Sequence, residues 1–422
     1  MSLYDTDEKI QRFILVGVEA EQTTISAEDS LNELAELLTT AGGEEAGRII
    51  QKMEMQNART YVGSGKVQEI KTLLAATGAD GIICDDELSP AQLKNLSDLL
   101  ETKIIDRTLL ILDIFSQRAV TKEGKMQIEL AQLEYRLTRL IGLGKELSRQ
   151  GAAVGTHTRG AGETKLEMDR RHIRARMDML RSQLKDVVKQ RELVRTQRQK
   201  NQIPIVALVG YTNAGKSTLF NRLTASGVLE EDKLFATLDT TTRRCELPGG
   251  RSVLFVDTVG FIHKLPHHLV KAFRATLEEA AYADILLHVV DGSHENAELH
   301  MQVTYDELLE LKAADKPILT VLNKQDLVKE EKPLSIPYGA EAVLHISALE
   351  ETGVQKVMEA VEEQLSHMEQ EIEIRLPYAQ GNLNDILHRN AQILEEQYQE
   401  EGIYLRLRVT ERYQKMVQSY QI

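Results

Sequence analysis

The central fold of this 422-residue chain is decided by the stretch Ile205-Val206-Ala207-Leu208-Val209-Gly210-Tyr211-Thr212-Asn213-Ala214-Gly215-Lys216-Ser217-Thr218. Its first five residues are apolar and mostly β-branched, which predicts a buried strand. Two glycines then open a tight loop, and Thr218–Leu223 follows as a helix-like segment. Strand, loop and helix together form a phosphate-loop pattern in the structural context that it requires.

The residues of this loop have distinct expected tasks on a nucleoside triphosphate. Backbone N–H groups and the helix N-terminus are expected to hold phosphate oxygens, Lys216 to neutralise the β- and γ-phosphates, and Ser217 to bind Mg²⁺. Asn213 either holds a monovalent cation such as K⁺ between the phosphates or makes a simple loop hydrogen bond. The nucleotide contacts expected here are Gly210, Tyr211, Thr212, Asn213, Ala214, Gly215, Lys216, Ser217 and Thr218.

A second motif, Asp257-Thr258-Val259-Gly260, follows the apolar run Leu254–Val256, 47 residues beyond Gly210. A carboxylate at the end of a buried strand anchors Mg²⁺ from its second shell, and Gly260 can place its N–H near the γ-phosphate. Between the two motifs lies Phe235-Ala236-Thr237-Leu238-Asp239-Thr240-Thr241-Thr242. A switch needs a Thr that binds Mg²⁺ only beside a γ-phosphate, and spacing alone does not choose among these four threonines.

Base recognition is expected from two later segments. Asn323-Lys324-Gln325-Asp326 follows an apolar strand, and a carboxylate there can accept the N1–H and 2-amino groups of guanine. Adenine lacks this pair of donors, so the pattern favours GTP over ATP. Ser347-Ala348-Leu349 follows another apolar strand and is suited to contact guanine O6 through a backbone N–H.

The residue after Gly260 is Phe261, where many switch GTPases have a glutamine that orients the attacking water. Phenylalanine cannot orient water, so hydrolysis by the chain alone is expected to be slow, with a partner or a cation supplying the missing stabilisation. The expected catalytic set is Lys216, Gly260 and a switch threonine.

The rest of the chain predicts a multidomain α/β protein. Residues 1–117 alternate strands and helices, which favours a parallel sheet, and 118–200 carry two heptad-spaced apolar runs typical of an antiparallel helical hairpin. Residues 201–370 form the phosphate-loop domain with a doubly wound sheet, and 371–422 a small α+β module in which Leu383–Gln397 is expected to be a helix.

Composition narrows the class further. Hydrophobic residues make up 42% and charged residues 27%, which fits an ordinary globular protein. There are two cysteines, no apolar leader and no run long enough to span a bilayer, so we expect a cytoplasmic protein without membrane insertion.

Charge is unevenly distributed along the chain. The formal net charge is −14, yet residues 118–200 have 20 Lys+Arg against 10 Asp+Glu, whereas the remainder has 31 against 55. The expected hairpin tip, 148–162, has no acidic residue, and Arg149, His157 and Arg159 are the expected RNA contacts. The alternative is a coiled coil whose charges are only solvated.

The sequence resembles an HflX-type GTPase of the translation-factor-related class over nearly its whole length. The blocks that carry the resemblance are Arg59-Thr60-Tyr61-Val62-Gly63-Ser64-Gly65-Lys66, Asp106-Arg107-Thr108, Gln127-Ile128-Glu129-Leu130-Ala131-Gln132-Leu133, Leu147-Ser148-Arg149-Gln150-Gly151, Gly162-Glu163-Thr164-Lys165-Leu166-Glu167 and Phe235-Ala236-Thr237-Leu238-Asp239. The resemblance implies a Mg²⁺-dependent GTPase that binds the large (50S) ribosomal subunit and its 23S rRNA and splits or rescues ribosomes stalled under stress. It also implies that Thr237 is the Mg²⁺-binding threonine and that the flanking residues Phe235, Ala236, Leu238 and Asp239 belong to the nucleotide site. We expect the protein to act as a monomer.

Two other functions stay open at this point. One is a GTPase that assembles the large subunit. The other is an ATP-driven RNA-remodelling enzyme that uses the N-terminal half, although Gly63-Ser64-Gly65-Lys66 is expected to be a turn into a helix because it lacks the full phosphate-loop spacing. His263, His267 and His268 are expected to belong to a switch segment, because no Cys or carboxylate set accompanies them as metal ligands.

Overall fold

The computed structural model divides into two compact units. The first comprises Met1–Gln190, Glu231–Asp239 and Ile262–Thr276, and the second comprises Arg191–Glu230, Thr240–Phe261 and Leu277–Ile422. The structure describes residues 10–21, 25–152, 161–201, 203–225, 234–235, 240–265, 279–328, 334–335 and 340–422. Within these ranges the side chains of 141–152, 161–166, 192–201, 389–390 and 410–412 are not described.

A four-stranded parallel sheet of order β2-β1-β3-β4 begins the first unit. Its strands are β1 (Arg12–Glu19), β2 (Glu44–Lys52), β3 (Gly81–Cys84) and β4 (Lys103–Asp106), and its helices are α1 (Ala27–Thr40), α2 (Ser64–Thr77), α3 (Pro90–Leu100) and α4 (Arg107–Arg118). The apolar face of α1, which includes Leu31 and Leu34, is fully buried. Ser89 caps α3 in a capping box with Gln92, and Pro90 occupies the first turn. Gly63 is the N-cap of α2, so the Gly-Ser-Gly-Lys segment is a turn into a helix.

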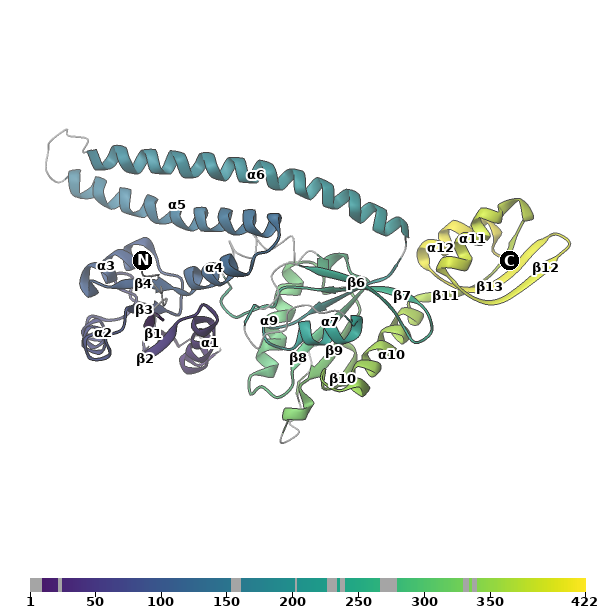
Figure 1. Ribbon diagram of the computed structural model, residues 1–422, viewed down its shortest axis with the longest axis horizontal. Coiled ribbons are helices and arrows are strands. Elements are labelled where there is room, and N and C mark those ends of the chain that lie inside the picture. The colour runs from purple at the N-terminus through teal and green to yellow at the C-terminus, as the bar shows by residue number, and fades with distance from the viewer. Residues whose placement is uncertain are drawn as a thin grey trace, which may run out of the picture. The chain divides into compact units, whose positions relative to one another are not determined.

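Two long helices, α5 (Lys122–Ala152) and α6 (Ala161–Asn201), lie side by side as the hairpin (Figure 1). Arg170 donates to the Leu140 carbonyl at 2.5 Å, and Arg176 pairs with Glu129 at 2.6 Å. The predicted seam of α6 is present, since Met177 and Leu180 are buried. Helix α5 differs from the prediction of a single apolar seam, because its most buried side chains, among them Tyr135, lie on a second face that packs against α3 and α4.

The second unit is built on a six-stranded sheet of order β10-β9-β8-β5-β7-β6, in which only β6 is antiparallel to its neighbour. Its strands are β5 (Ile205–Val209), β6 (Thr241–Glu246), β7 (Ser252–Asp257), β8 (Ile285–Asp291), β9 (Ile318–Asn323) and β10 (Ala340–His345). Helices α7 (Lys216–Thr224) and α10 (Glu351–His367) cover one face. Helix α9 (Ala297–Glu310) covers the other face. The sheet is therefore doubly wound, and its strands end where the expected site residues lie.

The chain ends in a three-stranded antiparallel sheet of order β11-β13-β12. The elements are β11 (Glu369–Leu376), α11 (Gly381–Asn390), β12 (Gln392–Gln399), β13 (Gly402–Thr410) and α12 (Glu411–Val417). The predicted helix over Leu383–Gln397 is wrong in its second half. Helix α11 ends at Asn390, and from Gln392 onward the chain pairs with β13 as strand β12. Tertiary pairing across a hairpin overrides the weak local preference of this polar segment.

The expected fold class is confirmed, with a parallel N-terminal sheet, a helical hairpin, a doubly wound sheet and a C-terminal α+β segment. Within the described ranges, no helix is both long and apolar enough to cross a membrane. Of the two cysteines, Cys84 is fully buried at the end of β3 and Cys245 is half-buried on β6.

Candidate functional site

The loop after β5 holds a shape that only glycine permits at two positions. Gly210 has φ +147°, and a Cβ there would lie 2.1 Å from the Val289 carbonyl oxygen. Gly215 has φ +90°, and its Cβ would lie 2.2 Å from Nδ2 of Asn323. Both positions bring the loop backbone against neighbouring strands, so the loop N–H groups stay at the carboxyl edge of the sheet.

Lys216 begins α7 and is buried, with its Nζ donating to the Tyr211 carbonyl at 2.6 Å. Burial lowers the pKa of Lys216 to about 8, although the nearby Asp257 carboxylate opposes that shift. A desolvated amine of this kind interacts strongly with an anion, because no competing water surrounds it. The geometry is suited to the phosphate contact that the sequence predicts.

Ser217 and Asp257 are brought together, since the Ser217 hydroxyl donates to Oδ2 of Asp257 at 2.9 Å. Asp257 ends β7 and is fully buried, and Thr258 donates to the Leu208 carbonyl at 2.6 Å, which fixes the end of β7 against β5. This arrangement fits a Mg²⁺ site, with a hydroxyl ligand and a carboxylate behind it. The buried Thr212 hydroxyl, in the same loop, makes no hydrogen bond to a described residue.

The segment after Asp257 folds back onto the phosphate loop. Phe261 donates its N–H to the Gly210 carbonyl at 3.1 Å, and its own carbonyl accepts from Thr212 at 2.8 Å. A Cβ on Gly260 would lie 2.8 Å from both Nζ of Lys216 and Cα of Thr212, so a glycine is required here. The Phe261 side chain is buried, and its phenyl ring carries no polar group that could orient water.

The expected base-recognition segments meet at the ends of β9 and β10. Asn323 donates to the Ala214 carbonyl at 2.9 Å and accepts from the Ala348 N–H at 2.8 Å. Lys324 is in the left-handed region and pairs with Asp291 at 2.8 Å. Asp326 lies in a short 3-10 helix, Gln325–Leu327, and is exposed. The Asn323 side chain therefore links the phosphate loop to the Ser347-Ala348-Leu349 segment by hydrogen bonds, a role that the motif alone does not reveal.

Some expected residues lie outside the described part of the chain. They are Ala236, Thr237, Leu238, Asp239, His157, Arg159, His267 and His268, together with the side chain of Arg149. Phe235 is described and belongs to the first unit. Where the structure describes the chain, it contains no group of three or more His, Cys, Asp or Glu residues able to hold a metal ion.

One buried residue near the site was missed by sequence reasoning. His288 lies on β8 opposite Val209 of β5, and neither ring nitrogen bonds to a described residue. Burial, reinforced by the charge of Lys216, lowers the pKa of His288 to about 4, so the ring is neutral near pH 7. A histidine within an apolar strand is the signal that could have found it.

Comparison with known proteins identifies the family. The family model described as GTP-binding GTPase N-terminal matches residues 28–116, and the one described as GTP-binding GTPase Middle Region matches residues 118–198. A third model, described as 50S ribosome-binding GTPase, matches residues 205–324. A relative named GTPase HflX from Lacrimispora saccharolytica is 49% identical over 403 residues, which cover 96% of this chain and 94% of the relative.

The chain belongs to the HflX family of GTPases. The Escherichia coli GTPase HflX is 42% identical over 377 residues, covering 89% of this chain and 88% of that protein. Among solved structures, a GTP-binding protein from Sulfolobus solfataricus in complex with GDP is 27% identical, with a TM-score of 0.43 over 84% of this chain and all of that one. The expected resemblance and the GTPase activity are confirmed by the family membership.

Proposed function

We propose that this HflX-family GTPase is a Mg²⁺-dependent, cytoplasmic monomer that binds the large (50S) ribosomal subunit and its 23S rRNA. It splits or rescues stalled ribosomes, and hydrolysis of GTP to GDP and phosphate switches its affinity for the subunit. The observation that carries the proposal is a basic helical hairpin on an otherwise acidic chain that also has a GTP site. The description of the family model over residues 205–324 supports the same partner.

The hairpin supplies charge that RNA can use. Arg171, Arg174 and Lys185 on α6 are exposed, so their cationic groups are available to phosphates. Contacts of this kind supply sequence-independent affinity that falls as salt concentration rises. At the tip, Arg149, His157 and Arg159 are the proposed contacts, within a glycine-rich stretch that permits close approach of backbone to RNA.

In the proposed GTP site, Lys216 neutralises the β- and γ-phosphates, and the Gly260 N–H contacts the γ-phosphate. Ser217 and Thr237 would hold Mg²⁺, with Asp257 behind them, and the ion would supply positive charge that stabilises the phosphate oxygens. Asn213 has φ +59° and is proposed to hold K⁺ beside the phosphates. Replacing Na⁺ by K⁺ should then raise the hydrolysis rate, and an Asn213→Ala variant should lose that response.

The decisive experiment is density-gradient co-sedimentation of the full chain with ribosomes in GDP and in a non-hydrolysable GTP analogue. We expect co-sedimentation with large subunits in the analogue and much less in GDP. Equal sedimentation in both nucleotides would overturn the switching claim, and none in either would overturn the partner. Preference for precursor particles over mature subunits would instead support the assembly function.

The hairpin contribution is tested by charge reversal. Arg149→Glu with Arg159→Glu should weaken subunit binding at least tenfold at moderate salt and flatten its salt dependence. The matched control, Lys71→Glu with Lys356→Glu, makes the same change in net charge at exposed positions outside the hairpin. Equal loss in both variants would show that only net charge matters.

A further inference from the structure

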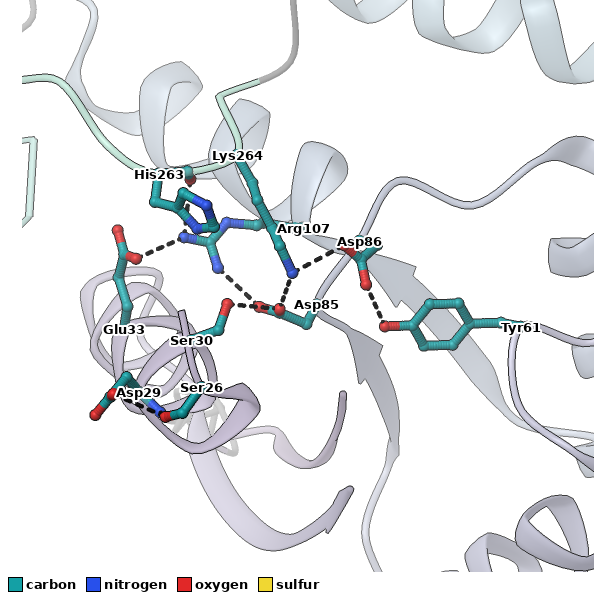
Figure 2. Close-up of polar contacts among 10 residues, drawn as sticks. All are labelled: Ser26, Asp29, Ser30, Glu33, Tyr61, Asp85, Asp86, Arg107, His263 and Lys264. Carbon is teal, nitrogen blue, oxygen red and sulfur yellow. Dashed lines mark hydrogen bonds and ion pairs between the residues drawn. The ribbon is translucent and has the colours of Figure 1, made fainter. Parts of the chain in front are cut away.

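The residues that follow Phe261 are held by a buried ionic cluster in the first unit (Figure 2). Arg107, at the start of α4, donates to the His263 carbonyl at 3.1 Å. The same guanidinium pairs with Asp85 at 2.8 Å and with Glu33 at 3.0 Å. Arg107 is 1% exposed and Asp85 2% exposed, so this central ion pair is removed from water. We name this cluster of Glu33, Asp85, Arg107, His263 and Lys264 the latch.

Lys264 closes the latch from the other side. Its Nζ pairs with Asp85 and, at 2.8 Å, with Asp86, while its backbone is in the left-handed region at φ +55°. Tyr61 donates its hydroxyl to Asp86 at 2.6 Å, and Ser30 donates to Asp85 at 2.6 Å (Figure 2). Burial alone would raise the pKa of Asp85, but the charges of Arg107 and Lys264 outweigh burial and lower it. The two cations thus keep a buried carboxylate charged.

Helix α4 contacts the other switch region as well. Phe115, two turns beyond Arg107, packs edge-on against Phe235 with ring centroids 4.5 Å apart. Phe235 directly precedes the Ala236–Asp239 segment in which the Mg²⁺-binding threonine is proposed. One helix therefore touches chain segments next to both parts of the GTP site that are expected to respond to the γ-phosphate.

Asp106, the residue before Arg107, binds helix α5 of the hairpin. Asp106 is the N-cap of α4 and accepts from the Leu109 N–H at 2.9 Å. Its carboxylate also accepts from the Tyr135 hydroxyl at 2.7 Å and pairs with Arg139 at 2.5 Å, and both of these residues lie on α5. Asp106 is fully buried, so the middle of α5 is tied to the start of α4. We name Asp106, Tyr135 and Arg139 the anchor.

We propose that α4 couples the GTP site to the helical hairpin, with Arg107 as a positioning residue that holds the segment after Gly260 and Asp106 as the adjacent residue that holds α5. The inference rests on the proposed function only for the task given to the hairpin. Gly260 lies four positions before Lys264 in the chain. A γ-phosphate contact that displaces Gly260 therefore also displaces the latch residues His263 and Lys264.

The latch is suited to switch between two arrangements rather than to loosen gradually. Separating Lys264 from Asp85 would leave a buried carboxylate with one cation fewer, which is costly unless Arg107 shifts to compensate. A shift of Arg107 moves the first turn of α4, and that turn is capped by the Asp106 carboxylate that Tyr135 and Arg139 bind. A nucleotide that favours one arrangement therefore also favours one position of α5.

Hydrogen exchange of the purified full-length protein tests the coupling without ribosomes. We expect amides within residues 107–140 to exchange at rates that differ at least fivefold between GDP and a non-hydrolysable GTP analogue. Lys264→Met should reduce this difference to less than twofold while fluorescent-nucleotide titration shows that both nucleotides still bind. Lys264→Arg keeps the charge and should retain the difference. Lys52→Met, which removes a lysine paired with Glu19 outside the latch and the anchor, should also retain it.

A second variant separates the two halves of the pathway. Tyr135→Phe should keep the nucleotide-dependent exchange in residues 107–118 but lose it in 122–140. If the difference persists throughout in Lys264→Met, or if the unmodified protein shows none, the coupling proposal is wrong. Failure of the unmodified protein to co-sediment with large subunits would instead overturn the ribosomal function and leave the exchange result intact.

Discussion

The phosphate loop and the first turn of α4 each hold a buried cation, but they hold it by different means. Lys216 donates to a carbonyl only five residues away, and its loop is shaped by two glycines with left-handed backbone. Arg107 donates to the carbonyl of His263, which lies 156 residues further along the chain. Local backbone geometry therefore positions the phosphate-binding Lys216. Contacts between distant segments, such as that of Arg107, hold the chain that follows Gly260.

The largest expected effect comes from removing the buried amine of the phosphate loop. Lys216→Ala should lower the single-turnover rate of GTP hydrolysis about 10³-fold, because the buried amine stabilises charge that develops on the phosphates. The melting temperature should not fall, since a desolvated amine is removed. The exposed Lys356→Ala is the control. A variant that still hydrolyses GTP at the original rate would contradict this role of Lys216, and ATP hydrolysis that survives the substitution would favour the ATP-using N-terminal half.

The next effect concerns stability beside the loop. The folded-state pKa of His288 is about 4, below its ordinary 6.5, so the folded state binds the proton less well than the unfolded state. Stability is therefore fully present above pH 6.5 and is lost as the pH falls towards 4, by about 3 kcal/mol. Urea titrations at pH 7 and pH 4 should show a loss that is smaller in His288→Gln by this amount. An identical loss in both proteins would contradict the assignment.

Guanine selectivity gives a somewhat smaller effect. Asp326→Asn replaces an acceptor by a donor facing the N1–H and 2-amino groups, so GTP affinity should fall about 100-fold. Xanthosine triphosphate should gain relative affinity in the same variant. Competition binding of the two nucleotides measures the change, and Asp315→Asn, outside the motif, serves as the control. Unchanged preference for guanine would remove Asp326 from base recognition.

The smallest effect concerns the hydrogen bond between Tyr135 on α5 and Asp106 at the start of α4. Tyr135→Phe removes the hydroxyl that donates to the buried Asp106, which should lower the free energy of unfolding by about 1–2 kcal/mol. Thermal unfolding of the full-length protein measures the change. Tyr398→Phe alters a tyrosine that is 70% exposed and should leave stability unchanged. Equal stability of all three proteins would mean that the anchor does not hold α5.

The sequence predicted those parts of the molecule whose conformation is set by neighbouring residues. Ser89 and Pro90 mark the start of α3 by local chemistry alone, whereas the Gln92 side chain that completes the capping box was not predicted. The glycines of the phosphate loop specify its shape. It did not predict the second buried face of α5, because Tyr135 is buried only when α4 is beside it. The strand over Gln392–Gln399 was missed for a similar reason, since its pairing with β13 is invisible to local preference.

Within the candidate site the same division holds. Lys216, Ser217, Asp257 and Gly260 were found because their motifs have fixed spacing, and the structure brings them together. Asn323 connects the phosphate loop to the segment after β10, and Phe261 binds the loop through its backbone. Both roles depend on contacts between residues that are distant in the sequence. His288 and Arg107 belong to no catalytic motif, so only packing reveals them.

The state of the two thiols has a practical consequence. Burial raises the pKa of Cys84 and of the half-buried Cys245, so both are poor in the thiolate form that reacts with maleimides. A single cysteine introduced on an exposed turn of α6 would therefore be labelled well ahead of them. Fluorophores attached in this way could report hairpin displacement in otherwise unmodified protein, without first building a cysteine-free background.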